Sequence, residues 1–232
     1  TLGKKVKTIG AMAFTRNKIK EIDPDSVPLG YDSESNWFIT MCEQLGTDYT
    51  SATGDHYLFD NADNQAFVKR FRQWYQDGLL TTQTLYGAYT SGLFVNQDPT
   101  KATSYMSIGS SAGATHQRPD KVDEKYPFDV GIATIPQLNA AAPKVISQGP
   151  SLTIFKKSNP QEVMASWLFV KYLTTCVEFQ AEFSMASGYV PVIESVKDHP
   201  IYSKFLANAN GGDNITALSA KTCLDQKDAY FV

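Results

Sequence analysis

Apolar residues recur at helical spacing in the first third of the chain. In the stretch 33–45 they fall three and four residues apart, which predicts a helix with one apolar face made of Trp37, Phe38, Met41, Cys42 and Leu45. Ser33 or Ser35 can cap the start of this helix, and Gly46 can end it. The stretch 64–79 repeats the design and ends at Gly78, whereas the polar stretch 49–60 predicts a loop or a short hairpin.

The middle of the chain has a different texture. The stretches 105–108, 130–135 and 152–155 are short and rich in β-forming residues, and turn-forming residues separate them, so each predicts a strand. The stretch 80–101 is rich in Thr, Tyr and Gly, which predicts irregular surface structure.

Helical spacing returns at position 158. Ser158 or Asn159 provides a cap and Pro160 suits the first turn, which predicts a helix to about residue 174. Its inward-facing residues are expected to be Val163, Met164, Trp167, Leu168 and Leu173. A second helix over about 177–186 should end at Gly188, before the extended segment 189–192 with its proline.

The order of helices, then strands, then helices favours an α/β fold in two parts. One economical arrangement builds a helical lobe from residues 1–103 and 157–232. The residues 104–156 then form crossing strands and a remnant of a second lobe. The chain would pass between the lobes twice, near Ser104 and near Lys156.

The composition excludes several classes of function. A net charge of −3 argues against a nucleic-acid partner, because phosphate backbones require a basic face. No apolar run approaches the length of a membrane span. Three widely spaced cysteines form neither a disulfide framework nor a zinc site, and Cys42 and Cys176 are predicted to be buried thiols. The three histidines lack metal-ligand spacing, so we expect neither a metal nor a cofactor.

The stretch 109–113, Gly-Ser-Ser-Ala-Gly, carries the most specific chemistry. It follows the predicted strand 105–108 and can direct backbone N–H groups and two hydroxyls at one point. Two interpretations compete. The stretch fits the G-x-S-x-G pattern of a hydrolase nucleophile, and it equally fits a polar cradle for a hydroxylated or anionic small molecule.

Six segments in succession resemble one family. They are PLGYDSESNWFITMCEQLG, MSIGSSAGA, FDVGIATIPQ, ISQGPSLTIFKKS, PQEVMASWLFVKYLTT and SGYVPV. The chain resembles, over nearly its whole length, the extracellular solute-binding proteins of ABC importers (family 1, the maltose- and glycerol-phosphate-binding branch). The resemblance implies a periplasmic-binding-protein-like α/β fold of type II, whose two lobes close over a ligand about a hinge. It also implies that this chain holds most of the helical C-terminal lobe and the returning strands of the N-terminal lobe.

The resemblance further implies a set of ligand-contacting residues. They are Ser110, Ser111, Gly149, Tyr189, Trp37 and, where an aromatic residue could stand, Glu34. Their chemistry suits the role: hydroxyls supply donors and acceptors, glycine lets backbone approach closely, and aromatic faces stack on sugar rings. Each of three residues has an alternative, purely structural interpretation. Gly149 would then only bend the chain before Pro150, Tyr189 would only pack on the preceding helix, and Trp37 would belong to the core.

The resemblance therefore implies a binding protein rather than an enzyme. It would capture a polar solute, such as a sugar, an oligosaccharide or a polyol phosphate, and deliver it to the permease subunits of an ABC importer. The protein is expected to be a monomer, extracellular or periplasmic, with a lipid anchor on a segment ahead of Thr1. Without the larger N-terminal lobe, this chain alone is expected to bind solute weakly or not at all.

The alternative is a serine hydrolase in which Ser111 is the nucleophile and Asp198 and His199 are its partners. A nucleophile elbow must lead directly into a helix, whereas the residues after this turn reach Pro119 within six positions. No oxyanion segment of the HGGG type is present either. A third hypothesis, a protein-interaction fragment, remains open.

Overall fold

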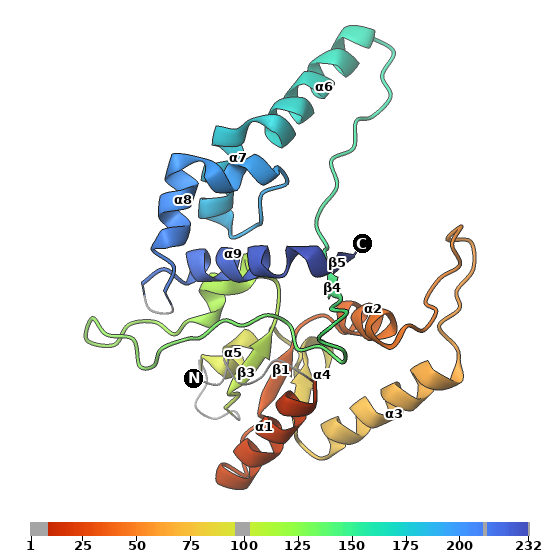
Figure 1. Cartoon of the computed structure of the whole chain (residues 1–232), viewed down its shortest axis with the longest axis vertical. Helices are drawn as coiled ribbons and strands as arrows, with labels where there is room; N and C mark the ends of the chain where they lie inside the picture. The colour runs from red at the N-terminus through yellow and green to blue at the C-terminus, as the bar shows by residue number, and fades with distance from the viewer. Residues whose placement is uncertain (1–8, 96–102, 211–212, 232) are drawn as a thin grey trace.

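The computed structural model describes residues 9–95, 103–210 and 213–231. Its sheet of three parallel strands has the order β2-β1-β3, and Leu29 lies opposite both Leu80 and Met106. The strands are β1 (Leu29–Tyr31), β2 (Leu80–Thr82) and β3 (Met106–Ile108), and α1 (Ile9–Ile22) precedes them. Parallel strands need crossover connections. These are α2 (Glu34–Leu45) and α3 (Ala62–Gln76), then α4 (Gln83–Tyr86) and α5 (Ser91–Phe94) (Figure 1).

The two helices predicted in the first third are confirmed. The Ser33 side chain caps α2 by accepting the N–H of Asn36, and Gly46 ends the helix in the left-handed conformation. α3 begins at Ala62, two residues before the predicted start, because the Asn61 side chain caps it by accepting the N–H of Asn64.

The segment between α2 and α3 is the predicted short hairpin, with Thr50 and Tyr57 in an antiparallel bridge. The buried side chain of Asn64 holds its base. It donates to the backbone oxygens of Asp48 (3.1 Å) and Phe59 (3.0 Å) and accepts a hydrogen bond from Thr47. Because these partners lie in the loop, one buried amide fixes where the hairpin leaves the helix pair.

Two of the three predicted strands in the middle of the chain are absent. The stretches 130–135 and 152–155 form no strand. A strand needs a backbone partner, and the N–H of Ile135 donates instead to the Gln226 side chain (3.2 Å). The parallel pair found in this region is β4 (Val145–Ile146) with β5 (Tyr230–Phe231).

The prediction of irregular structure over 80–101 was also wrong in part. Its first three residues form the buried strand β2, and α4 and α5 follow. A leucine followed by two β-branched threonines fits a buried parallel strand, and the surrounding Thr, Tyr and Gly concealed that pattern.

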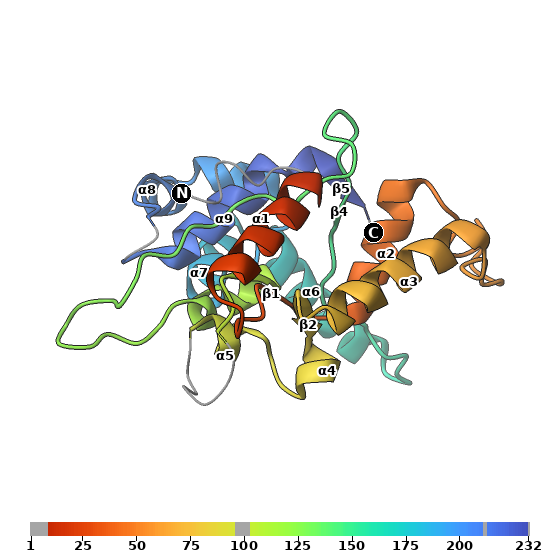
Figure 2. The same cartoon turned by 90° about the horizontal axis from the view of Figure 1, so that it is seen from below.

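Helices follow the serine turn (109–113) and again fill most of the chain from Pro160 onward. They are α6 (Pro160–Thr175), α7 (Val177–Ser187), α8 (Pro200–Ala207) and α9 (Ile215–Asp225), with short 3₁₀ turns η2 (Ser111–Gln117), η3 (Glu194–Asp198) and η4 (Lys227–Ala229). Fully buried Ala181, Val196 and Tyr202 form the core between α7, η3 and α8. In Figure 2, α2 and α3 lie at one end of the molecule and α7 to α9 at the other, with the three-stranded sheet between them.

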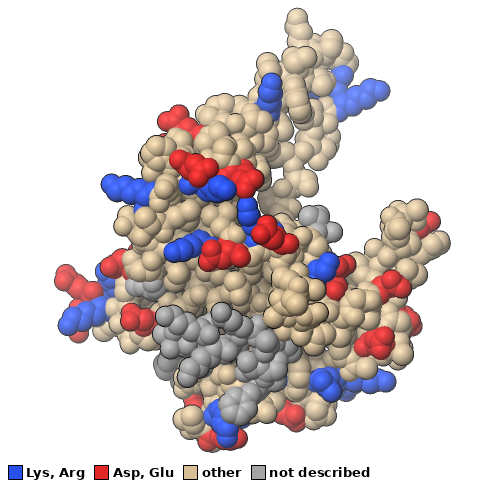
Figure 3. All heavy atoms as spheres, viewed as in Figure 1, with Lys and Arg blue, Asp and Glu red and all other residues tan. Residues whose placement is uncertain are grey.

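Helix α6 has the predicted bounds but not the predicted packing. Met164, Trp167 and Leu168, expected to face inward, are 56%, 50% and 56% exposed. The helix extends away from the rest of the chain, and the segment leading to it from β4 runs beside it (Figure 1). In Figure 3 this uppermost part carries few charged side chains, whereas acidic and basic side chains are interspersed below it. The expectation of an inward apolar face was wrong for these three residues, and Phe169 and Tyr172, outside the predicted set, are exposed on the same helix.

Candidate ligand-binding site

The three parallel strands end at one edge of the sheet. Tyr31, Thr82 and Ile108 stand in register there, so the residues that follow them emerge side by side. The chain runs from β1 to β2 on one side and then to β3 on the other, which makes this edge a topological switch point. In open parallel sheets, ligands bind outside the carboxyl ends of the strands at such a point.

Asp32, directly after β1, lies at the centre of this edge. Its N–H donates to the backbone oxygen of Ile108 (2.9 Å), and its Oδ1 accepts both the N–H and the hydroxyl of Thr90 (2.9 Å each). Its Oδ2 would lie 3.1 Å from a Cβ placed on Gly109. The next residue, Ser33, has a φ of 63°, a conformation that non-glycine residues rarely adopt. Sequence analysis did not place Asp32 in the site, because the strand β1 that ends directly before it was not predicted either.

Glu34 begins α2 beside the end of β2. Its Oε1 accepts the N–H of Thr84 (2.8 Å), which joins two of the three strand ends. Burial raises the pKa of the Glu34 carboxyl, but hydrogen bonds from Thr82, from its own backbone and from Thr84 outweigh burial and lower the pKa overall. Glu34 is therefore ionised at neutral pH and partly occupied by protein donors.

Trp37 lies one turn further along α2 and is half-buried. Its ring centroid is 3.9 Å from that of Phe71 and 5.3 Å from that of Phe67, both on α3. The structure thus places Trp37 in an aromatic cluster between the two helices. Whether it also contacts ligand stays a prediction.

The predicted serines lie at the end of β3. Ser110 is exposed and caps η2, since its Oγ accepts the N–H of Ala112 (3.3 Å). Ser111 is half-buried and lies near the Cys223 thiol of α9. Burial raises the pKa of Cys223, while hydrogen bonds with Tyr230, Ser111 and Ser219 oppose the increase.

The end of α7 meets the serine turn. Gly188 has a φ of 76°, and a Cβ on it would lie 3.0 Å from the backbone oxygen of Ser111. Tyr189 follows at once, is 41% exposed, and stacks on Phe183 with 6.4 Å between centroids and 22° between planes. The structure therefore places the backbone of Ser111 beside Gly188, the residue directly before Tyr189.

Gly149 is exposed and a Cβ on it would meet no atom within 4 Å. Its neighbour Gln148 accepts a hydrogen bond from Asn36 (3.0 Å), which places this segment against the start of α2. The predicted residues thus form two groups: Ser110, Ser111 and Tyr189 beside β3, and Glu34, Trp37 and Gly149 beside α2. Asp32 directly follows β1, two residues before Glu34, and its N–H donates to Ile108 at the end of β3, which leads into the serine turn.

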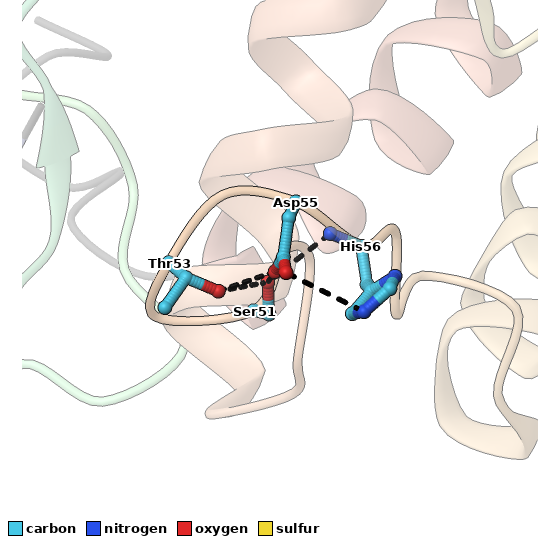
Figure 4. A network of polar contacts seen from close by, with 4 residues as sticks. All are labelled: Ser51, Thr53, Asp55 and His56. Carbon is cyan, nitrogen blue, oxygen red and sulfur yellow. Dashed lines mark hydrogen bonds and ion pairs between the residues drawn. The ribbon is translucent and has the colours of Figure 1, made fainter.

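A second polar network occupies the hairpin between α2 and α3 (Figure 4). Ser51 and Thr53 donate to Asp55 Oδ1, and His56 Nε2 lies 3.5 Å from Asp55 Oδ2. These hydrogen bonds, that from Thr53 first, lower the pKa of the Asp55 carboxyl. Ser51 Oγ donates to the aspartate and accepts the backbone N–H of His56 (3.2 Å), but it makes no hydrogen bond to the imidazole. The network therefore lacks the order of a catalytic triad and instead closes an exposed loop.

The hydrolase hypothesis gains no support at Ser111. The turn leads into a 3₁₀ helix rather than an α-helix. The Nδ1 of His199, the proposed base, is buried without a hydrogen-bond partner, so no carboxylate orients that imidazole.

Within the described residues, no cluster of His, Cys, Asp and Glu could hold a metal ion, and no helix could cross a membrane. The three cysteines are free: Cys42 is buried as predicted, whereas Cys176 and Cys223 are half-buried.

Comparison with known families agrees with this geometry. The model of the bacterial extracellular solute-binding proteins matches residues 3–210, so the chain belongs to that family. Its members bind solutes outside the cell, and as a class they are binding proteins rather than enzymes. No curated protein sequence matches the chain significantly.

Proposed function

We propose that the protein captures a polar solute outside the membrane and delivers it to the permease subunits of an ABC importer. The solute would be a sugar, an oligosaccharide or a polyol phosphate. The observation that carries the proposal is the close approach of Gly188, the residue before Tyr189, to the backbone of the Ser110–Ser111 turn, which follows β3 at the carboxyl edge of the sheet. We further propose that the protein acts as a monomer held at the membrane by a lipid.

The chemistry of this edge supports a hydroxylated ligand. Ser110 and Ser111 offer donors and acceptors with little bulk, and the exposed ring of Tyr189 offers a flat apolar face with a polar tip. Sugar rings present the matching pair of surfaces, hydroxyls at the rim and C–H groups on the faces. Glu34 and Gly149, on the α2 side, would contact the other end of the solute.

Titration calorimetry with sugars, oligosaccharides and glycerol phosphates tests the proposal, on the full-length protein with the N-terminal lobe that the family resemblance implies. Tyr189→Ala should weaken binding of the active solute by about 1 kcal/mol or more, the value of a stacked aromatic contact. Tyr57→Ala is the control, because Tyr57 is 77% exposed on the hairpin away from the sheet edge. Absence of binding throughout the panel, or equal losses in both variants, would refute the proposal.

We also propose that a second lobe covers α6 and the segment 152–155. Leu152 and Phe155 on the segment and Phe169 on α6 are exposed, and together they line a groove of about 270 Å³. Adjoining exposed apolar side chains are typical of an interaction surface. The residues 1–232 alone should therefore bind solute weakly, and adding the N-terminal lobe should restore the affinity. Micromolar binding of solute by these residues alone would show that the binding site is complete without a second lobe.

A further inference from the structure

Asp32 connects three elements at the carboxyl edge of the sheet. Through its backbone it continues the β1–β3 pairing by one residue, since its N–H donates to the oxygen of Ile108. Through Oδ1 it accepts both donors of Thr90, whose side chain is fully buried at the start of α5. Water cannot replace Asp32 as the acceptor for these two donors.

Two glycines make room for this arrangement. A Cβ on Gly30 would lie 2.6 Å from the Cβ of Thr90, so only glycine lets Thr90 approach β1 closely enough to reach Asp32. On the other side, the Asp32 carboxylate passes Gly109, where a Cβ would lie 3.1 Å from Oδ2 and 3.4 Å from Gln117 Nε2. The carboxylate therefore fills the place that a side chain at position 109 would take.

We infer that Asp32 is the positioning residue of the serine turn: it fixes Gly109, and hence Ser110 and Ser111, against the end of β1. The inference rests on the proposed function, in which that turn contacts the solute. Oδ1 is occupied by Thr90 and Oδ2 faces Gly109, so Asp32 acts through the turn rather than on the ligand.

Asp32→Asn separates positioning from folding. The amide oxygen still accepts both donors of Thr90, so the melting temperature should stay close to that of the parent. The amide NH₂ replaces Oδ2 and points its hydrogens at Gly109, which should displace the turn. Loss of one or two solute hydrogen bonds should weaken binding about tenfold. Asp60→Asn, at an exposed aspartate bonded to Gln65, is the matched control and should bind as the parent does.

Amide hydrogen exchange gives a readout that needs no ligand. The N–H of Ala112 donates to Ser110 Oγ in the parent. Its exchange rate should rise several-fold in Asp32→Asn and stay at the parental value in Asp60→Asn. Unchanged exchange at Ala112, or parental affinity in Asp32→Asn, would overturn the inference. If the full-length parent, with its N-terminal lobe, binds no solute in the panel, the proposed function fails, and the exchange result still decides whether Asp32 positions the turn.

Discussion

Gly188 is the residue whose replacement tests most directly how the two sides of the site are joined. It ends α7 in the left-handed conformation, with a φ of 76°, and its α-carbon faces the backbone of the serine turn. In Gly188→Ala, the new methyl carbon would lie 3.0 Å from the oxygen of Ser111 and 3.4 Å from the Cα of Ala112. Both are main-chain atoms, so neither can rotate away.

The expected loss of stability has two parts. The left-handed conformation costs a non-glycine residue about 1–2 kcal/mol. The close contact forces α7 and the turn apart, which should cost a further ~1–3 kcal/mol. Gly46→Ala measures the first part alone, because Gly46 ends α2 with a φ of 68° and a Cβ there would meet no atom within 4 Å. The difference between the two losses of stability is the cost of the close contact between the new methyl group and Ser111.

Thermal and urea unfolding of both variants provide the measurement. For a domain of this size, 1 kcal/mol shifts the melting temperature by about 2–4 °C, so Gly188→Ala should melt several degrees below Gly46→Ala. Gly188→Ala should also lose affinity for the solute, since the displacement moves Tyr189 away from the turn, whereas Gly46→Ala should keep it. Equal melting temperatures, or parental affinity in Gly188→Ala, would show that α7 and the turn are not tightly joined.

Three further predictions concern single residues. Trp37→Ala should lower both the stability of the fold and the affinity for solute, because the Trp37 ring packs between α2 and α3, whereas Trp37→Phe should keep most of the stability. Thermal melts and solute titrations measure both effects. If folded Trp37→Ala binds solute as well as the parent does, Trp37 belongs to the core alone. A fluorophosphonate probe should not label the protein, and labelling that disappears in Ser111→Ala would establish a hydrolase. Glu194 accepts hydrogen bonds from Lys227 and Lys197, which lower its pKa from 4.5 to about 2, so its contribution to stability is present above pH 4.5 and is lost as the pH falls towards 2. Acid unfolding of Glu194→Gln should lack this component, and an unchanged pH profile would contradict it.

The sequence by itself determined the long helices and their ends. The helix over 33–45, the helix after Asn159 and the stop at Gly188 are local features, in which a cap, a period of 3.6 residues and a glycine act within one turn. Family membership was likewise readable from ordered segments of sequence, and the family comparison confirmed it. The division into lobes and the contacts of each site residue with ligand stay predictions.

The tertiary structure alone decided which short apolar stretches become strands and which residues meet. The stretch 152–155 has a strand-like pattern yet is no strand, while β2 was concealed in a stretch rich in Thr, Tyr and Gly. Strand formation depends on a partner distant in the chain, and no local pattern specifies that partner. The role of Asp32 and the contact between Gly188 and Ser111 escaped prediction for the same reason: each depends on atoms that only the folded chain brings within 4 Å.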